Sequence, residues 1–445
     1  MEENTIKNLV IKYCQHISHP IYLWTENSED HWLQINNWLN NRERVNNFAT
    51  KKFMNHIPDD LVFSIISNLP FKSLKRFGCL QRSWTLLFEN SHFMNLFRNN
   101  FICNHHSYYD DTSLILSTVV PYPNNMKSTL FSISGENFQN MEKLYFPDQL
   151  QEDYHYGYGI LDSVNGILCL YQLEFGKHLA YLWNPTTNEI KVIPPSPVEF
   201  VPHFIIPSIH YHGFGYDSVT DDYKVIRQVG TYPAGRECDD IRDSFDFRSL
   251  PREWQMYSLK SDSWKKLELE YFSVPPLRYQ TNENFYFEGM CHWLGYHERP
   301  KELLVSFDLE NEVCITTPVP LDIPMEIYDN FDMYYVNTHL LLLNGSIALM
   351  SSYDSDNTFY ISILGEVGNK ETWTKLFVFE PTPPLAFSIG AWYLGNIVFQ
   401  THDGDLAWFD LSTHTVQKLG IKVHGGDSQL VVYKKSLLPI EGINN

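Results

Sequence analysis

The sequence lacks any C-x-x-C pair among its seven cysteines, which are scattered along 445 residues. Closely spaced cysteine pairs are typical of structural zinc sites and redox motifs, so neither organises this fold. An odd, scattered set of thiols also favours a reducing compartment over an oxidising one. We therefore expect an intracellular protein of the cytoplasm, the nucleus or both.

Long apolar runs are missing as well. No stretch approaches the ~18 apolar residues of a membrane-spanning helix, and the N-terminus MEENTIKNLVIKYCQ lacks the apolar core and cleavage site of a secretory signal. A formal net charge of -20 makes a nucleic-acid backbone a poor partner. We expect neither membrane nor nucleic acid as partner, and an acidic surface suits basic proteins.

Motifs for catalysis and cofactor binding are absent too. The sequence has no P-loop, no G-x-S-x-G and no H-E-x-x-H, and GYGIL at 157–161 lacks the third glycine of a dinucleotide fingerprint. The histidine cluster at 203–212 has no acid or cysteine at ligand spacing. Adjacent acids such as Asp221 and Asp222 face opposite ways on an extended chain, which favours solvated turns. We predict no catalytic residue, no cofactor and no metal.

What the sequence does contain is a large apolar fraction, 43%, with 15% aromatic residues, which is enough for a globular core. Residues 1–52 carry no pattern that assigns them. Residues 53–98 have helical periodicity, and residues 105–438 alternate as β-strands do. We predict an α+β multidomain protein, with a small all-α unit followed by an all-β domain.

The helical unit begins with a short amphipathic helix. Pro58 suits its first turn and Pro70 its end. Between them, Leu61 and Ile65 lie at i, i+4 spacing and start an apolar face. A second helix follows Ser73.

A third helix is expected after Asn90 or Ser91, either of which can cap it, with Phe93 and Phe97 on one side. A unit this small buries too little apolar surface to be robust alone. Its apolar surface therefore awaits a partner, which is either another protein or the β domain of the same chain.

The string IPDDLVFSIISNLPFKSLKRFGCLQRSW, which starts at Ile57, resembles the F-box motif. It has the proline-acid-acid-Leu start, the L-P core, the K-S-L-x-R-F segment and the C-x-x-R-S-W end, whereas His56 stands where an apolar residue is usual. The resemblance implies docking onto the Skp-type adaptor of a cullin-based ubiquitin ligase and, through it, onto cullin and RING subunits. The implied adaptor-binding residues are Ile57, Pro58, Leu61, Ile65, Ile66, Leu69, Pro70, Leu74, Phe77 and Trp84.

The β region is built from repeats. Strand–turn–strand patterns recur at 181–193, 255–267, 304–316 and 406–419, and glycine-led strands recur at a spacing of about 50 residues. This period indicates a β-propeller of kelch-like type with about six units, which start near 112, 155, 211, 285, 337 and 390. The last run, QLVVYKK, can pair with the first unit and close the ring. Five or seven blades and a large β-sandwich remain as alternatives.

Two kinds of turn are expected in these repeats. Asn344-Gly345 stands between apolar runs and predicts a tight hairpin turn. Asp308 and Asp410 occupy the same slot in two repeats, where Asn184 and Ser258 stand in two others. A polar group that recurs at one structural place favours a turn-former over a catalytic acid.

The phrases WNPTTNE, FGYDSVTDDYKV, MYSLKSDSW and FEGMCHWL resemble, in this order, the domain that follows the F-box in a large group of plant proteins. The resemblance covers roughly residues 105–435. It implies that the propeller binds a target protein.

Two long segments, 230–253 and 320–337, interrupt the repeat. Insertions in a propeller emerge on its faces, where binding residues concentrate, although tolerated length variation explains them equally well. The second segment combines acids with aromatic residues, which suits a basic target. Its candidate target-binding residues are Tyr328, Phe331 and Tyr334.

Together these features predict a non-catalytic, substrate-recognition subunit of an SCF-type (Skp–cullin–F-box) ubiquitin ligase. One alternative is an F-box scaffold that acts outside a ligase. Another is a propeller enzyme, for which no convergent carboxylates or metal ligands are visible.

Overall fold

The computed structural model describes most of the β region and parts of the chain before it. The described residues are 22–25, 31–34, 63, 66–67, 74, 88, 90–103, 112–122, 125–135, 140–147, 150, 158–172, 179–197, 205–233, 252–269, 284–297, 301–320, 336–353, 358–381, 385–392 and 396–440. The chain divides into two compact units, Met1–Ile65 and Ile66–Asn445. Among the described residues, no helix combines the length and the apolar character that crossing a membrane requires.

The first unit contains a short β-hairpin that the sequence patterns did not predict. Strand β1 (Tyr22–Thr25) pairs antiparallel with β2 (His31–Gln34), with Trp24 opposite Trp32. Both strings, YLWT and HWLQ, contain residues of high β propensity. Four residues per strand are too few for alternation to stand out, so the sequence patterns give no signal for this hairpin.

Helix α6 (Ser91–Cys103) in the second unit is the predicted third helix. The Asn90 side-chain oxygen accepts the amide of Phe93 at 3.0 Å, so Asn90 is the N-cap. Phe93 and Phe97 are buried, as the expected apolar side of this helix requires. The other two predicted helices lie outside the described residues except at isolated positions.

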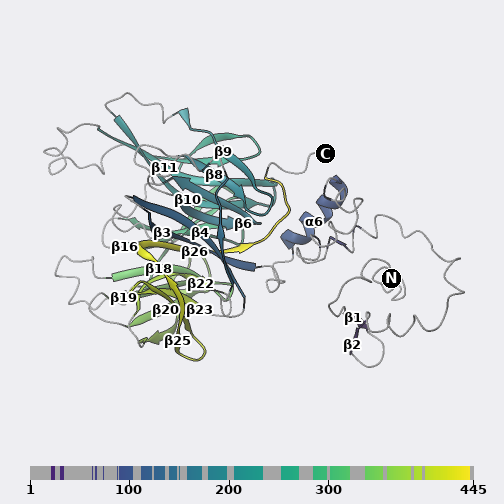
Figure 1. Cartoon of the computed structure of the whole chain (residues 1–445). Coiled ribbons are helices and arrows are strands. Elements are labelled where there is room, and N and C mark those ends of the chain that lie inside the picture. The colour runs from purple at the N-terminus through teal and green to yellow at the C-terminus, as the bar shows by residue number, and fades with distance from the viewer. Residues whose placement is uncertain are drawn as a thin grey trace, which may run out of the picture. The chain divides into compact units, whose positions relative to one another are not determined.

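Six four-stranded antiparallel sheets make up the β region (Figure 1), and we number them as blades 1 to 6. Blade 1 consists of β26 (His424–Lys434), β3 (Thr112–Tyr122), β4 (Asn125–Ser134) and β5 (Asn140–Leu144). Blade 2 consists of β6 (Tyr158–Val164), β7 (Ile167–Gln172), β8 (Ala180–Asn184) and β9 (Glu189–Ile193). Blade 3 consists of β10 (Ile205–Asp217), β11 (Asp222–Pro233), β12 (Glu253–Ser258) and β13 (Ser263–Leu267).

The remaining blades follow the same order. Blade 4 consists of β14 (Asn284–Phe287), β15 (Met290–His297), β16 (Lys301–Asp308) and β17 (Val313–Pro318). Blade 5 consists of β18 (Val336–Leu343), β19 (Ser346–Tyr353), β20 (Phe359–Leu364) and β21 (Trp373–Phe379), with a 3-10 turn, η7 (Lys370–Thr372), before β21. Blade 6 consists of β22 (Leu385–Trp392), β23 (Asn396–Thr401), β24 (Asp405–Asp410) and β25 (Thr415–Lys422).

The blades form a closed ring. Their first strands contact one another in the order β26, β6, β10, β14, β18, β22 and back to β26. Strand β26 pairs with β3, with Val431 opposite Ile115, so the run QLVVYKK closes the ring as predicted. The fold is a six-bladed propeller, which confirms six units over the alternatives of five blades, seven blades and a sandwich.

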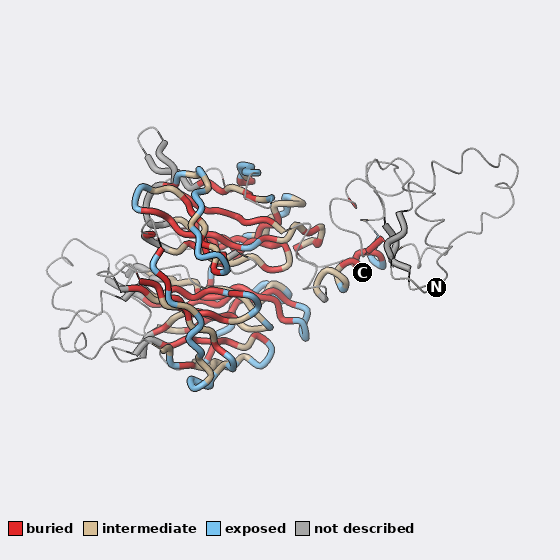
Figure 2. Tube along the Cα trace, turned by 90° about the horizontal axis from the view of Figure 1, so that it is seen from below, coloured by how far each residue is buried: buried red, intermediate tan, exposed pale blue. Residues whose placement is uncertain are grey.

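The core is divided among the contacts between blades, and each of the six contacts holds its own apolar cluster. Leu182 of blade 2, for example, packs with Phe214 of blade 3 in one of these clusters. Figure 2 shows buried residues along the strands and exposed residues at many of the turns. A one-residue slip would move every side chain of a strand to the opposite face, so the specific packing within these clusters is what fixes the register.

Both expected turn types are present. Asn344 and Gly345 have φ of 50° and 76°, the two positive values of a type I′ hairpin turn. The carboxylate of Asp308 accepts the amides of Glu310 and Asn311 at 2.9 and 3.1 Å. Asp410 likewise accepts the amide of Ser412 at 2.7 Å, and these bonds confirm the turn-forming role of both aspartates.

The side chain of Gln429 on β26 forms hydrogen bonds that join blade 1 to blade 2. Strand β6 has a register shift between Ile160 and Asp162, where its backbone leaves the ladder of β7. The Gln429 amide donates to the carbonyl of Ile160 at 2.6 Å and accepts its N–H at 3.2 Å. Both residues are buried, so this contact satisfies two backbone groups that water does not reach.

We predict that Gln429→Ala lowers the free energy of unfolding by about 1–3 kcal/mol, because it leaves the buried N–H and C=O of Ile160 without a partner. The measurement is the thermal melting temperature of the full chain. The control is Gln417→Ala on the exposed edge of β25, which we expect to change stability by less than about 0.5 kcal/mol. Equal effects of the two substitutions would contradict the role of Gln429.

Candidate functional site

Because the strands within each blade are antiparallel, the two ends of the ring carry different connections. All six first strands run toward one end, which we call the turn end because short turns such as Asn165-Gly166 join the strands there. The opposite end is the loop end. There, β11 ends at Pro233 before β12 begins at Glu253, and β17 ends at Pro318 before β18 begins at Val336.

The predicted insertions therefore leave from and return to the loop end. Their bounds need correction, because residues 230–233 belong to β11, residue 253 to β12 and residues 336–337 to β18. The strands therefore continue into the ends of both predicted insertions, and the turn-forming residues there did not indicate this.

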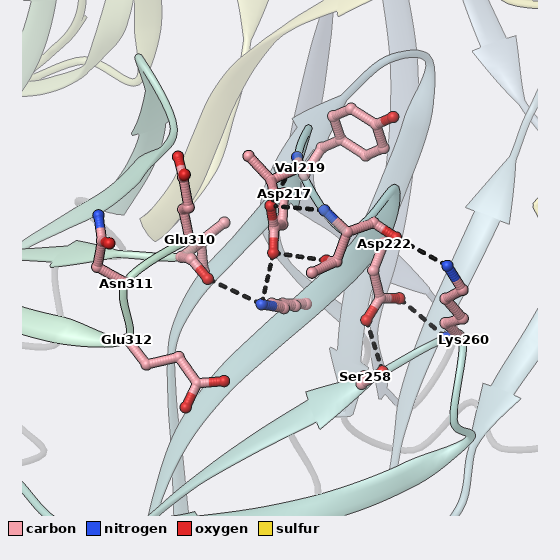
Figure 3. Close-up of polar contacts among 12 residues, drawn as sticks. Asp217, Val219, Asp222, Ser258, Lys260, Glu310, Asn311 and Glu312 are labelled. Carbon is pink, nitrogen blue, oxygen red and sulfur yellow. Dashed lines mark hydrogen bonds and ion pairs between the residues drawn. The ribbon is translucent and has the colours of Figure 1, made fainter.

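A buried ion pair lies at the turn end of blade 3, in the neighbourhood drawn in Figure 3. Lys224 Nζ lies 2.7 Å from Asp217 Oδ2, and both side chains are almost fully buried. The same ammonium donates to the carbonyl of Leu309 at 2.8 Å, which links blade 3 to blade 4. Burial raises the pKa of Asp217, but hydrogen bonds from Lys224, Thr220 and the backbone outweigh it and lower the pKa to about 2.

Asp217 also closes the turn between β10 and β11, because its carboxylate accepts the amides of Val219 and Thr220 at 2.9 and 3.2 Å. All hydrogen-bonding capacity of this carboxylate thus goes to the turn and to Lys224. A carboxylate held in this way has no proton to exchange near neutral pH and no free lone pair for a substrate. We therefore assign this ion pair a structural role at the turn end.

The neighbouring acids Asp221 and Asp222 bond to different partners, as expected of adjacent residues. Asp222 accepts the hydroxyl of Ser258 at 2.5 Å and the amide of Lys260 at 2.8 Å (Figure 3). Asp221 instead accepts the Tyr216 hydroxyl at 2.6 Å. The expectation that both are solvated is wrong for Asp222, which is buried because it joins β11 to the end of β12.

A second carboxylate, Asp162, links two blades that are not neighbours. It follows the register shift of β6 in blade 2, and its Oδ2 accepts the amide of Tyr286 in blade 4 at 2.6 Å. Its Oδ1 accepts the amide of Ser163 at 2.6 Å. Burial raises the pKa of Asp162 to about 7, against the opposite effect of these two amides. Sequence patterns gave no signal for this residue, because Tyr286 lies 124 positions away.

A group of three buried rings lies at the contact between blades 3 and 4. The rings of His212, Trp254 and Trp293 pack together, with His212 centred 4.8 Å from Trp254 and 5.5 Å from Trp293. Both His212 Nε2 and Trp254 Nε1 are buried, and neither finds a hydrogen-bond partner among the residues that the structure describes. Burial lowers the pKa of His212 to about 3, so this imidazole is neutral. Among the described residues, no group of three potential metal ligands comes together, here or elsewhere.

The structure describes few of the site residues predicted from the sequence. Of the ten implied adaptor-binding residues only Ile66 and Leu74 are described, and they are 3% and 0% exposed. The other eight lie outside the described residues, and so do Tyr328, Phe331 and Tyr334. These assignments therefore remain predictions.

Comparison with known proteins identifies the β region. The family described as the F-box associated beta propeller domain matches residues 124–437. F-box protein CPR1 of Arabidopsis thaliana is 29% identical over 264 residues, which are 54% of this chain and 59% of that protein. F-box protein At4g19940 of the same plant is 24% identical over 409 residues, which are 87% of this chain and 90% of that protein. The chain thus spans about three fifths of the length of CPR1.

Solved structures resemble the chain only distantly. TolB from Acinetobacter baumannii aligns over 76% of this chain and 72% of its own, with a TM-score of 0.41 and 9% identity. A six-bladed fungal lectin from Aleuria aurantia aligns over 70% and 96%, with a TM-score of 0.33 and 9% identity. Likenesses below a TM-score of 0.5 have no bearing on what this chain does.

The raised pKa of Asp162 predicts a pH dependence. Between the usual value, 3.8, and about 7, the folded chain binds this proton more tightly than the unfolded chain does. Stability from this group is therefore present at low pH and falls as the pH rises through that window. We expect Asp162→Asn, which cannot titrate, to gain about 2 °C or more in melting temperature relative to wild type between pH 5 and pH 8. His212 is unchanged in both chains, so the comparison isolates Asp162, and a constant difference across this range would contradict the assignment.

Proposed function

The chain belongs to the family of proteins that carry an F-box associated β-propeller domain, and from this we propose that it is the substrate-recognition subunit of an SCF-type ubiquitin ligase. The proposal rests on the order of two parts of the chain, the F-box-like segment and the propeller. A segment that resembles the F-box, from Ile57 to Trp84, stands directly before the propeller. The match to CPR1 covers only part of each protein, so the whole activity is our proposal.

In this proposal the F-box segment docks a Skp-type adaptor, and cullin and RING subunits follow through it. Ile66 and Leu74 are buried within the chain, as residues that pack inside a helical unit are. We therefore place the docking face among the other apolar positions, above all Leu61 and Ile65. Basic residues outnumber acidic ones within 53–98, which suits an acidic partner.

The propeller then holds the target protein. Both insertions open at the loop end, away from the short turns, and the segment 320–337 combines four acidic residues with Tyr328, Phe331 and Tyr334. Carboxylates steer a basic protein toward the surface, and aromatic rings bury area at a low cost in side-chain entropy. We infer that the loop end is the target-binding face and that the target is basic.

The subunit needs no catalytic group of its own for this role. It holds a target beside the ubiquitin-charged enzyme that the rest of the complex carries, and proximity turns an encounter between two proteins into a local event. The buried thiols of Cys169 and Cys291 suit a reducing compartment, which supports a cytoplasmic or nuclear location. Co-purification of the cullin separates this proposal from a scaffold outside a ligase.

We predict that Leu61→Asp with Ile65→Asp abolishes co-purification of adaptor and cullin, because each change puts a charge into an apolar interface at a cost of several kcal/mol. The matched control is Ser64→Asp with Asn68→Asp, which adds the same charges at the same i, i+4 spacing on the polar side of the predicted helix. Adaptor bound at the wild-type level by the first variant would remove the proposed docking face. Unchanged melting of the propeller separates lost docking from lost folding.

We predict that Tyr328→Ala, Phe331→Ala and Tyr334→Ala together raise the dissociation rate of targets while adaptor binding stays intact. The targets are the proteins that co-purify with the full chain in the Leu61→Asp, Ile65→Asp background, which removes the ligase subunits. Adaptor binding is measured separately, in the triple variant with Leu61 and Ile65 unchanged. The control is Met141→Ala with Tyr145→Ala, two side chains that are 48% and 75% exposed on or next to an outer strand. If the triple variant retains the same proteins, and association does not slow between low and physiological salt, the segment is not part of the recognition surface.

A further inference from the structure

One turn recurs five times at the turn end of the propeller. Each copy has four residues between two strands, and its last residue has a positive φ that L-residues seldom adopt. These last residues are Asn188 (63°), Asp221 (55°), Asp262 (48°), Glu312 (55°) and His414 (57°). Three of the five are acidic, and each of these three meets a basic side chain from a neighbouring element.

Two of these contacts join neighbouring blades. Lys191 on β9 of blade 2 lies 3.0 Å from Asp262 in the turn of blade 3. Lys265 on β13 of blade 3 pairs in the same way with Glu312 in the turn of blade 4. The outer strand of one blade thus pins the turn of the next.

The third contact joins the propeller to α6. Arg98 Nη1 donates to Asp221 Oδ2 at 2.7 Å, and Nη2 pairs with the other carboxylate oxygen. The same Nη2 donates to the Tyr216 hydroxyl at 3.1 Å, and this hydroxyl donates to Asp221 at 2.6 Å. A two-pronged arginine–carboxylate pair with a shared hydroxyl fixes direction as well as distance.

Further contacts hold the last turns of α6 on the propeller. Lys434 Nζ, at the end of β26, lies 4.3 Å from the ring centre of Phe101 and 3.5 Å from its carbonyl oxygen. Ile102 packs against the apolar cluster between blades 2 and 3. Earlier in the second unit, Ser67 accepts a hydrogen bond from Asn100 at 2.8 Å. Helix α6 therefore belongs at once to the end of the F-box segment and to the turn end of the ring.

We propose that α6 does for the turn between β10 and β11 what the outer strands β9 and β13 do for the turn of the next blade, and that Arg98 and Asp221 are positioning residues that fix the direction of α6 on the propeller. We call Arg98, Tyr216 and Asp221 the α6 joint. This inference rests on the proposed function for its consequence, because α6 directly follows the F-box segment in the chain and is the part of the chain that the propeller holds. The joint itself does not depend on which proteins bind.

The test is the distribution of distances between two bio-orthogonal spin labels in the full chain, one at the exposed Ser91 of α6 and one at Val313 on β17, which is 48% exposed. We expect one narrow distribution in the wild type. Arg98→Ala and Asp221→Asn, of which the second tolerates the positive φ but removes the charge, should each broaden it about two-fold or more, while melting of the propeller stays the same. The charge exchange Arg98→Asp with Asp221→Arg should restore the narrow distribution.

The matched control is Lys191→Ala, because the side chains of Lys191 and Asp262 are 21% and 52% exposed against 16% and 48% for Arg98 and Asp221. The proposed role of the α6 joint would be contradicted if both single variants kept the wild-type distribution, or if the control broadened it equally. Co-purification of the adaptor is measured on the same samples. If the wild-type chain does not co-purify with the adaptor, the proposed function is contradicted. The α6 joint is tested by the distance distributions alone.

Discussion

The pairing of β26 with β3 is the contact on which the rest of the structure depends. It joins residues after position 424 to residues before position 122, so blade 1 exists only when both ends of the β region are in place. An open ring would leave strand edges with unpaired N–H and C=O groups, which are templates for pairing with other chains. It would also open two of the six apolar interfaces. Gln429 adds to the closure, because it bonds the backbone of Ile160 in the next blade.

Closure gives the two ends of the ring different properties. At the turn end, short turns are locked by their own side chains and by Lys224, whose ammonium joins Asp217 to the backbone of blade 4. A change of length there would break buried bonds, so this end suits a fixed attachment such as α6. At the loop end, the connections after β11 and β17 span residues 234–252 and 319–335. Connections of this kind tolerate changes of length better than locked turns do, so length variation suits this end of the ring.

Local patterns in the sequence predicted what local physics determines. The cap at Asn90, the turn at Asn344-Gly345 and the recurrent aspartates at 308 and 410 depend on residues within four positions. The period of the repeats predicted the number of blades, because every blade must bury the same two faces. The bonds of Asp162 to Tyr286, of Gln429 to Ile160 and of Arg98 to Asp221 span 124, 269 and 123 positions. No spacing rule reaches so far, since these contacts exist only after the ring has placed the blades.

The distribution of charge leads to the same division between the ends. At the turn end, Asp217, Asp221 and Asp262 are paired with Lys224, Arg98 and Lys191. A paired carboxylate projects little field beyond a Debye length of about 8–10 Å. The net charge of -20 therefore arises from other acids, and the segment 320–337 holds four acidic residues and no basic one. Because β17 ends and β18 begins at the loop end, the basic target that we propose would meet this unbalanced charge at that end.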